Sequence, residues 1–448
     1  MVSIHQGLTR LIYSAARPQV LESLDELNRV QWLSGDEVTA LQHRHIQDLL
    51  EYAYTYVPYY QELFKDIGFR PSDFAADPTS FSKIPLLTKE IIRQNHDRLI
   101  TTEEARRSRM TRAHTGGTTG EPLWFWKDST YRNFNTAYIY QSMEWSGFRM
   151  GQPQFWLWGH VPDRTGSWRA PFKDRVGNWI ANRFDSDAFV LTQQSMEKLT
   201  RQIEVHPDGV LWSYVSAAHR YAQFLQERGH SIKLRGVYVA AEPLFDHQRQ
   251  FIQEVLGCPV FDNYSSIDTG AIARECEQHS GLHIAARNCY VEVLRDGKPV
   301  PDGEDGEFVL TNLTNFGFPV IRYRIEDWGR KSTSSCICGR GEPMLEVVEG
   351  RMIDLFKTRD GRTVYGAFAD PLMPTLGDVK QFQVIQKSLD LLVFYIVADG
   401  PISEDKLLEL EQICKGILGE NVEVKFEFVD HLPSTPTGKH RFLISEVE

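Results

Sequence analysis

The sequence predicts an α/β protein with a large N-terminal domain of sheets and crossover helices and a small α+β domain at the C-terminal end. Strand-like apolar runs alternate with helical patterns through the middle of the chain, which is typical of parallel strands joined by crossover helices. After residue 350 the pattern changes to two strands, a helix and a strand within about a hundred residues, a common domain size. We therefore expect two domains, 1–350 and 351–448.

The composition is that of an ordinary globular protein, and it argues against several classes. A formal charge of -11 is unlike a duplex nucleic-acid binder, which needs a basic face. No apolar run reaches the roughly 18 residues of a membrane span, and the N-terminus lacks the apolar core of a signal peptide. Six cysteines in so long a chain do not make a disulfide scaffold. We expect a soluble cytoplasmic protein.

The first predicted elements are helices. Residues 40–57 carry apolar side chains at helical spacing, and Pro58 ends the pattern. An extended run at 84–89 leads into another helix, for which Thr88 is the expected N-cap.

The later elements follow from changes in the pattern. Shorter strands separated by Asp/Gly turns between residues 290 and 324 predict a more antiparallel subdomain. The expected parallel strands are 155–158, 210–214, 237–241 and 260–264, with a helix at 217–227. In the C-terminal domain we expect strands at 382–385, 391–397 and 422–429 and a helix at 404–417.

A glycine- and threonine-rich stretch at 113–122 is the first candidate site. Its three glycines let backbone N–H groups approach a ligand closely, and its three threonines add hydroxyl donors, which suits a polyphosphate. The alternative is a turn leading into a strand at 123–126. The stretch is not a Walker A loop, because Gly120 is followed by Glu121 rather than Lys.

This loop and several later segments occur in the order found in the adenylate-forming superfamily, which includes acyl-CoA synthetases and peptide-synthetase adenylation domains. Residues 115–122 resemble its phosphate loop, 240–244 its adenine-binding segment, and 263–268 its Tyr-Gly-x-Thr-Glu motif. The order continues through 305–312, 323–327, 350–351 and 437–439. Within the superfamily, the chain resembles phenylacetate-CoA ligase and the CapK-type proteins at 57–60, 84–89, 241–243 and 318–324.

The resemblance implies a mobile C-terminal domain, an active site between the domains, and a two-step reaction. A carboxylate attacks the α-phosphate of ATP to give an acyl-adenylate, and the acyl group then passes to an acceptor. Lys439 would neutralise charge at the α-phosphate, Asp268 would bind magnesium, and Asp327 would hold the ribose. The implied ATP-binding residues are Thr115, Gly116, Gly117, Thr118, Thr119, Gly120, Ala241, Glu242, Pro243, Tyr264, Ser265, Asp327 and Arg351. The structural alternatives are a helix-capping Asp268, a surface ion pair at Asp327 and a solvated Lys439.

Departures from the superfamily pattern leave the second step open. Ser265, Ile267 and Asp268 replace Gly, Thr and Glu of the motif, and Ile353 replaces a charged hinge residue. Residues 358–366 differ from the loop that shapes the pantetheine channel in CoA ligases. The acceptor is therefore CoA or another thiol, or an amine or hydroxyl. A degenerate scaffold that binds nucleotide or zinc without turnover is the remaining alternative.

A second candidate site combines cysteines and histidines from two distant segments. Cys276, His279 and His283 are followed much later by Cys336 and Cys338, and four such ligands form a closed structural zinc site. Relatives of phenylacetate-CoA ligase carry a similar pairing, which favours His283 over His279 as the fourth ligand. The alternative is a set of reduced core cysteines. We expect Cys258, Cys289 and Cys414 to be isolated packing residues.

Aromatic strands are the candidates for the acyl pocket. Trp158, His160 and Tyr214 would suit an aromatic or planar acid, although strands rich in tryptophan are commonly core. The expected partners are a small carboxylic acid, ATP and an acceptor, with magnesium and structural zinc as metals, no nucleic acid, and a homodimer left open.

Overall fold

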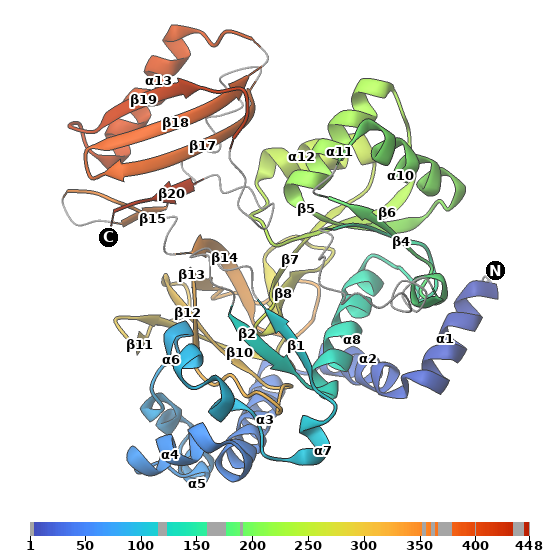
Figure 1. Cartoon of the computed structure of the whole chain (residues 1–448), viewed down its shortest axis with the longest axis vertical. Coiled ribbons are helices and arrows are strands. Elements are labelled where there is room, and N and C mark those ends of the chain that lie inside the picture. Colours follow the sequence, from blue (N-terminus) through green and yellow to red (C-terminus); the bar gives the residue numbers. More distant parts are fainter. Residues whose placement is uncertain are drawn as a thin grey trace. The chain divides into compact units, whose positions relative to one another are not determined.

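The computed structural model describes residues 4–114, 123–158, 176–188, 191–351, 355–359, 363–365, 379–398, 400–432 and 443–447. The chain divides into two compact units. The first contains Met1–Ile325 and Gly329–Val348, and the second contains Glu326–Trp328 and Glu349–Glu448. Each unit is described by itself below (Figure 1).

The N-terminal part of the first unit is helical, and two of its helices were predicted. Its helices are α1 (Ile4–Ala16), α2 (Pro18–Val30), α3 (Gly35–Tyr56), α4 (Pro58–Asp66), α5 (Pro71–Ala76), α6 (Lys89–Gln94) and α7 (Glu104–Arg107), with 3₁₀ helices at Pro78–Lys83 and His96–Leu99. Helix α3 begins earlier than predicted, because Ser34 and Glu37 form a capping box. Pro58 separates α3 from α4, and Thr88 caps α6 by accepting the Ile91 N–H at 3.2 Å, both as predicted.

A short antiparallel hairpin of β1 (Thr111–His114) and β2 (Trp124–Lys127) frames the glycine- and threonine-rich stretch. His114 pairs with Trp124 at the end of the hairpin nearest that stretch. Residues 115–122 themselves lie outside the described residues. Helix α8 (Ser129–Trp145) follows β2 directly, with Asp128 as its N-cap. The pairing of β1 with β2 thus fixes the backbone on both sides of the predicted phosphate loop.

Apart from the β1–β2 hairpin, the described strands of the first unit belong to one sheet in the order β11-β10-β12-β13-β14-β9-β8-β7-β6-β5-β3-β4. One half is parallel: β3 (Gln154–Trp158), β4 (Arg183–Asp187), β5 (Gly209–Tyr214), β6 (Leu234–Ala240) and β7 (Val260–Ser266). The other half holds β8 (Gly270–Glu275), β9 (Leu282–Ile284), β10 (Cys289–Arg295), β11 (Lys298–Pro299), β12 (Gly306–Asn312), β13 (Tyr323–Lys331) and β14 (Met344–Arg351). The predicted antiparallel subdomain is therefore continuous with the parallel strands, and pairing turns antiparallel between β7 and β8.

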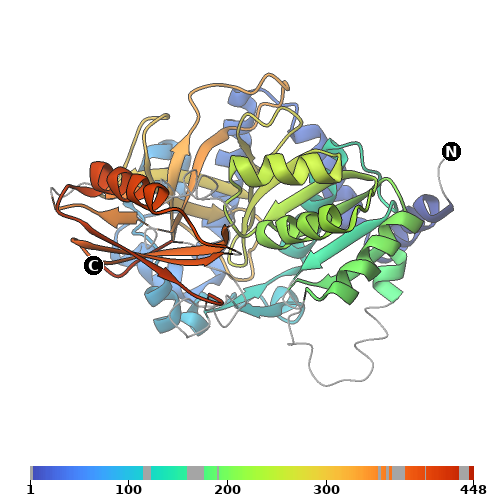
Figure 2. The same cartoon turned by 90° about the horizontal axis from the view of Figure 1, so that it is seen from above.

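Helices cover both faces of the parallel strands (Figure 2). Leu211 on β5 packs with Tyr221 and other side chains of α10 (Gln193–Val205), α11 (Val215–Arg228) and α12 (Asp246–Leu256). The next residue, Trp212, faces the opposite side and packs with Tyr138 of α8 and Leu27 of α2. Neighbouring residues of a strand point to opposite faces, so a sheet buried on both sides carries continuous apolar runs. This explains the patterns that predicted the α/β class, which the structure confirms.

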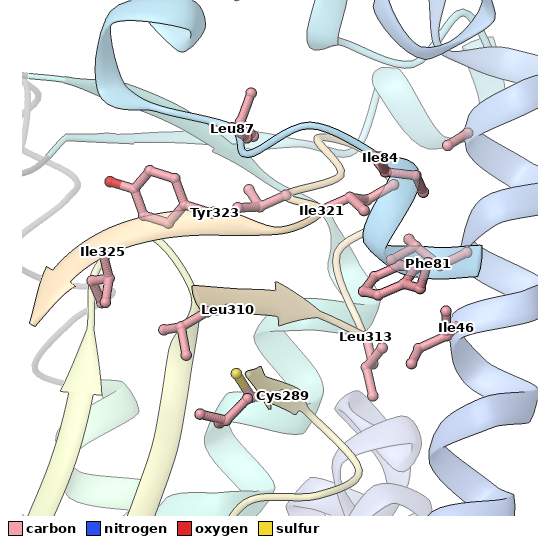
Figure 3. Packing of buried hydrophobic residues seen from close by; sticks show 14 of the residues in the cluster. Ile46, Phe81, Ile84, Leu87, Cys289, Leu310, Leu313, Ile321, Tyr323 and Ile325 are labelled. Atoms are coloured by element: carbon pink, nitrogen blue, oxygen red, sulfur yellow. The ribbon is translucent and has the colours of Figure 1, made fainter. Parts of the chain in front are cut away.

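The antiparallel strands share a second core with the N-terminal helices. Figure 3 shows Ile46 of α3, Phe81, Leu310 of β12 and Tyr323 of β13 packed together, and all four are buried. Arg322, just before β13, lies in the left-handed region at φ 51° and accepts the Leu87 N–H through its carbonyl at 2.9 Å. The segment at 84–89 is thereby fixed against β13.

The second unit has the strand and helix content predicted from the sequence. Strands β17 (Val379–Ser388), β18 (Leu391–Ala398), β19 (Glu423–Phe428) and β20 (Leu443–Ser445) form a sheet in the order β19-β18-β17-β20, and β15 (Leu355–Lys357) pairs with β16 (Thr363–Tyr365). Helix α13 (Glu404–Leu418) packs on the four-stranded sheet through Leu410, Cys414 and Leu418.

Candidate functional site

The carboxyl ends of the parallel strands form the candidate active-site edge. Strands β3, β5, β6 and β7 run parallel, so their ends lie on one edge of the sheet. In open α/β sheets, ligands bind at this edge, at a point where the strand arrangement changes. The predicted residues at the strand ends are Trp158, Tyr214, Ala241, Glu242, Pro243, Tyr264 and Ser265, and Asp268 follows β7 at the change to antiparallel pairing.

The two described acyl-pocket candidates lie against each other. The rings of Trp158 and Tyr214 stack with centroids 4.2 Å apart and planes 15° from parallel. Tyr214 is buried and belongs to the core formed with α10, α11 and α12. His160 lies outside the described residues. Core packing accounts for the pair, and its acyl role stays a prediction.

Glu242 has a structural contact that the sequence did not reveal. Its carboxylate accepts the Ser216 N–H at 2.7 Å and the Ser216 hydroxyl at 3.0 Å, at the beginning of α11. A carboxylate at a helix N-terminus satisfies free N–H groups and complements the helix dipole. The preceding residue, Ala241, adopts φ 70° and turns the chain at the end of β6. Contacts to adenine stay a prediction for this segment.

Asp268 is a buried carboxylate in the turn between β7 and β8. It is 5% exposed, and the Tyr323 hydroxyl donates to its Oδ2 at 2.7 Å. Burial raises the pKa of Asp268, while the Tyr323 bond and the charges of Lys89 and Lys127 act to lower it. The helix-capping alternative is wrong, because the turn leads into β8. A buried carboxylate of this kind is suited to bind a cation.

Sequence reasoning missed the residues that surround Asp268. Tyr323 lies within the predicted Tyr-Arg motif, and its hydroxyl reaches back across the sheet. The Tyr131 hydroxyl donates to the Ile267 carbonyl at 3.3 Å, and the Lys127 ammonium lies 5.1 Å from the centre of the Tyr131 ring. The only sequence signal was the position of Lys127 and Tyr131 just after the predicted phosphate loop.

A second buried carboxylate, Asp128, holds the hairpin in place. Its Oδ2 accepts the N–H groups of Phe316 and Gly317 at 3.1 and 3.0 Å and the Arg106 guanidinium at 2.8 Å. Its Oδ1 accepts the Tyr131 N–H at 2.9 Å. Asp128 thus ties the end of β2 to residues 316–317 and to the start of α8.

The other predicted nucleotide residues are described only in part. Asp327 is half-buried in β13 and follows Glu326, whose φ is 71°. Arg351 ends β14, and its side chain is outside the description. The residues that lie entirely outside the described ranges are Thr115, Gly116, Gly117, Thr118, Thr119, Gly120 and Lys439.

Four predicted zinc ligands converge in the first unit. The ligand atoms of Cys276, His283, Cys336 and Cys338 all lie within 4.8 Å of one another. Cys276 follows β8, His283 lies on β9, and the other two come from the loop between β13 and β14. His279 is elsewhere: its Nδ1 lies 3.2 Å from Glu275 Oε2, and its ring packs on Phe261.

The spacing of this cluster and its neutral histidine fit zinc. Sγ of Cys276 lies 3.6 Å from Sγ of Cys336, and Sγ of Cys338 lies 3.4 Å from Nε2 of His283. Tetrahedral zinc, with bonds of about 2.3 Å to sulfur and about 2.0 Å to nitrogen, separates such atoms by roughly 3.8 and 3.6 Å. Burial lowers the pKa of His283 to about 4, so its imidazole is neutral at pH 7, as a ligand must be.

Positive side chains border the cluster. The backbone N–H of Arg340 donates to Cys338 Sγ at 3.5 Å, and the Arg340 guanidinium lies 4.2 Å from the centre of the Trp145 ring. Trp145 in turn packs edge-on against His283 at 5.6 Å. Three thiolates and a divalent ion carry a net charge of −1, which a neighbouring guanidinium offsets. Cys258, Cys289 and Cys414 are buried separately, as predicted.

Comparisons with known proteins identify relatives of the chain. The CapK C-terminal domain matches residues 356–446. The chain is 22% identical to Protein CapK of Staphylococcus aureus, covering 95% of this chain and 92% of that protein. It is 27% identical to the phenylacetate-coenzyme A ligase of Escherichia coli (strain K12), covering 71% of this chain and 75% of that protein.

Solved structures share the fold. A 2-hydroxyisobutyryl-CoA ligase in complex with 2-HIB-AMP aligns with a TM-score of 0.74 at 19% identity, covering 94% of this chain and 92% of that one. An O-succinylbenzoate coenzyme A synthetase from Bacillus subtilis, in complex with AMP, aligns with a TM-score of 0.53 at 17% identity, covering 73% and 67%. These likenesses confirm the predicted adenylate-forming fold. Among the described residues, no helix is long and apolar enough to cross a membrane.

Proposed function

We propose that this chain, a homologue of CapK and of the phenylacetate-CoA ligases with the adenylate-forming fold, is an ATP-dependent ligase that activates a carboxylic acid as its acyl-adenylate. One observation carries the proposal. The described acyl-pocket and nucleotide candidates from β3, β5, β6 and β7 lie on the same carboxyl edge, next to the buried carboxylate of Asp268. An acid and a nucleotide bound along that edge would have their reacting groups adjacent.

The proposed roles follow from the chemistry of each residue. Backbone N–H groups and hydroxyls of residues 115–120 bind the phosphates, and Asp327 and Arg351 bind the ribose side of the nucleotide. Asp268 holds magnesium, which neutralises phosphate charge when it is bound. Lys439 stabilises the charge that develops between the carboxylate and the α-phosphate. Rotation of the C-terminal domain, 351–448, brings Lys439 to the site.

The acceptor in the second step is proposed to be CoA, the thiol named in the phenylacetate-coenzyme A ligase relatives. Transfer to an amine or hydroxyl is the alternative, because residues 358–366 depart from the CoA-ligase pattern. Release of AMP that depends on an amine rather than a thiol would favour the alternative.

Zinc is proposed as the structural metal at Cys276, His283, Cys336 and Cys338, on the fit of the donor set and its spacing. We also propose a cytoplasmic location, because ATP and reduced thiolates coexist there. A homodimer stays a proposal, which the molar mass in solution tests.

Carboxylate-dependent exchange between ATP and pyrophosphate tests the main proposal. A panel of acids is assayed with the native chain and with Lys439→Ala. We expect exchange with particular acids and a loss of about 100-fold to 1,000-fold in the variant, the usual effect of removing one charge-stabilising group. An absence of exchange across the panel, with retained magnesium-dependent ATP binding, would favour the nucleotide-binding scaffold without turnover.

A further inference from the structure

Lys127 is a half-buried lysine beside the candidate active-site edge. The proposed function assigns no role to this residue. It is the last residue of β2, the strand that leaves the predicted phosphate loop. Strand alternation places it on the same face as Phe125, whose ring lies 6.4 Å from the Tyr323 ring. Tyr323 is the residue that donates to Asp268. Lys127 therefore faces the same space as the proposed magnesium ligand.

Two neighbours define the position of its ammonium group. It lies 5.1 Å from the centre of the Tyr131 ring, a distance typical of a cation–π contact. Tyr131 is held in turn by its hydroxyl bond to the Ile267 carbonyl, one residue before Asp268. The backbone of Lys127 pairs with Thr111 and accepts from the Arg132 guanidinium at 3.2 Å. The lysine is thus held on a rigid hairpin and not on a mobile surface.

The charge of Lys127 is not matched by an ion pair within the parts of the chain that the structure describes. Asp268 is the acid that acts on it electrostatically, without forming an ion pair with it. Burial lowers the pKa of Lys127 to about 8, although Asp268 opposes the shift. A partly desolvated ammonium group without an ion-pair partner gains more interaction free energy from a bound anion than a fully solvated ammonium group does.

The predicted phosphate loop has a deficit of positive charge that Lys127 can supply. Residues 113–122 contain no Lys or Arg, and Glu121 adds a negative charge. A triphosphate carries about four negative charges, and one magnesium ion offsets only two of them. A cation on β2, next to Asp268, is suited to neutralise the phosphates that leave as pyrophosphate.

We propose that Lys127 contacts the β- and γ-phosphates of ATP, and the pyrophosphate product, from the strand that follows the glycine- and threonine-rich loop. This inference rests on the proposed function and adds a catalytic residue to it. Lys127 acts on the leaving group, whereas Lys439 is proposed to act at the α-phosphate.

The test compares Lys127→Gln and Lys127→Arg with a matched control. Lys331→Gln is the control, because Lys331 is also half-buried beside an aromatic ring, 5.9 Å from Tyr290, but its acidic neighbours are Glu292 and Asp302. The assay is exchange between ATP and pyrophosphate, from which KM is obtained separately for pyrophosphate, ATP and the acid. Thermal unfolding of each variant measures folding.

We expect Lys127→Gln to raise KM for pyrophosphate and ATP by roughly tenfold to a hundredfold, the effect of losing one charge-assisted contact. KM for the acid should stay within about twofold, because a phosphate contact does not touch the acid. Lys127→Arg should recover most of the affinity, and Lys331→Gln should leave all three KM values unchanged.

Three results would overturn the inference. The first is an unchanged KM for pyrophosphate in Lys127→Gln. The second is an equal rise in Lys331→Gln. The third is a loss of stability in Lys127→Gln together with an equal rise in KM for pyrophosphate and for the acid, which would make Lys127 only a structural counter-ion for Asp268.

The inference can fail separately from the proposed function. If the native chain exchanges with no acid, the ligase proposal fails, and calorimetric binding of magnesium pyrophosphate to the full chain then tests Lys127 directly. Weaker binding to Lys127→Gln than to the native chain and Lys331→Gln would support the phosphate contact, and equal binding to all three would overturn it.

Discussion

The cysteine and histidine cluster and the active-site edge are built in opposite ways. The cluster closes on itself, with four ligand atoms within 4.8 Å of one another and the charge of Arg340 acting on His283. The active-site edge instead has a buried carboxylate at Asp268, which accepts a hydrogen bond from the Tyr323 hydroxyl. The half-buried cation of Lys127 lies beside this edge. The cluster is arranged to stabilise the fold, whereas the edge retains charges that a ligand would satisfy. Mutations should therefore affect stability at the first region and activity at the second.

The largest effect on stability is expected at the cluster. A double variant, Cys336→Ser with Cys338→Ser, should lose bound zinc. Its unfolding free energy should fall by at least about 4 kcal/mol, because a metal at a free concentration a thousandfold above its Kd stabilises the folded state by that amount. Metal analysis of protein purified without chelator, followed by thermal unfolding, measures both. Stoichiometric zinc in the double variant would contradict the site.

Two histidine variants sharpen this prediction. His283→Gln should lose the metal, whereas His279→Gln should keep it, because Nδ1 of His279 lies beside Glu275 and Arg249 and outside the cluster. Stoichiometric zinc in His283→Gln would show that His283 is not a ligand.

The next effect is expected on catalysis at Asp268. Asp268→Asn should slow exchange by roughly a hundredfold, because a neutral amide binds magnesium poorly. It should leave the melting temperature unchanged or raise it, because burial raises the pKa of this carboxyl and the fold therefore disfavours its charge.

Asp128 provides the matched control for that variant. It is also a buried carboxylate, but it accepts two backbone N–H groups from residues 316–317 and pairs with Arg106. Asp128→Asn should lower the unfolding free energy by about 3 kcal/mol, since it leaves the Arg106 charge and backbone donors without their acceptor. A lower melting temperature in Asp268→Asn than in Asp128→Asn would contradict the proposed difference between the two acids.

The smallest effect is expected at Tyr323. Tyr323→Phe removes one hydroxyl donor to Asp268 and keeps the buried ring in the core. We expect the magnesium concentration that gives half-maximal exchange to change by less than about tenfold, because the net free energy of one hydrogen bond corresponds to a factor of that size. A loss as large as that of Asp268→Asn would mean that Tyr323 does more than orient the carboxylate.

Much of the fold was predictable because local patterns carry it. Apolar runs predicted the parallel strands. The Thr88 cap and Pro58 predicted helix limits, because both signals depend on residues adjacent in the chain. The joining of the antiparallel strands to the parallel ones in one sheet was not predicted. Strand order depends on pairing between distant segments, which periodicity does not record.

The sequence by itself determined which chemical groups are available: the ordered motifs, the thiol and imidazole ligands, and the carboxylate at position 268. Only the tertiary structure decided which of them meet. Cys338 reaches His283 across 55 residues, Tyr323 reaches Asp268 across the same separation, and Glu242 is engaged by Ser216. Each of these contacts is set by the order of strands in the sheet and the packing of helices against it. A sequence specifies such long-range contacts only through the fold as a whole.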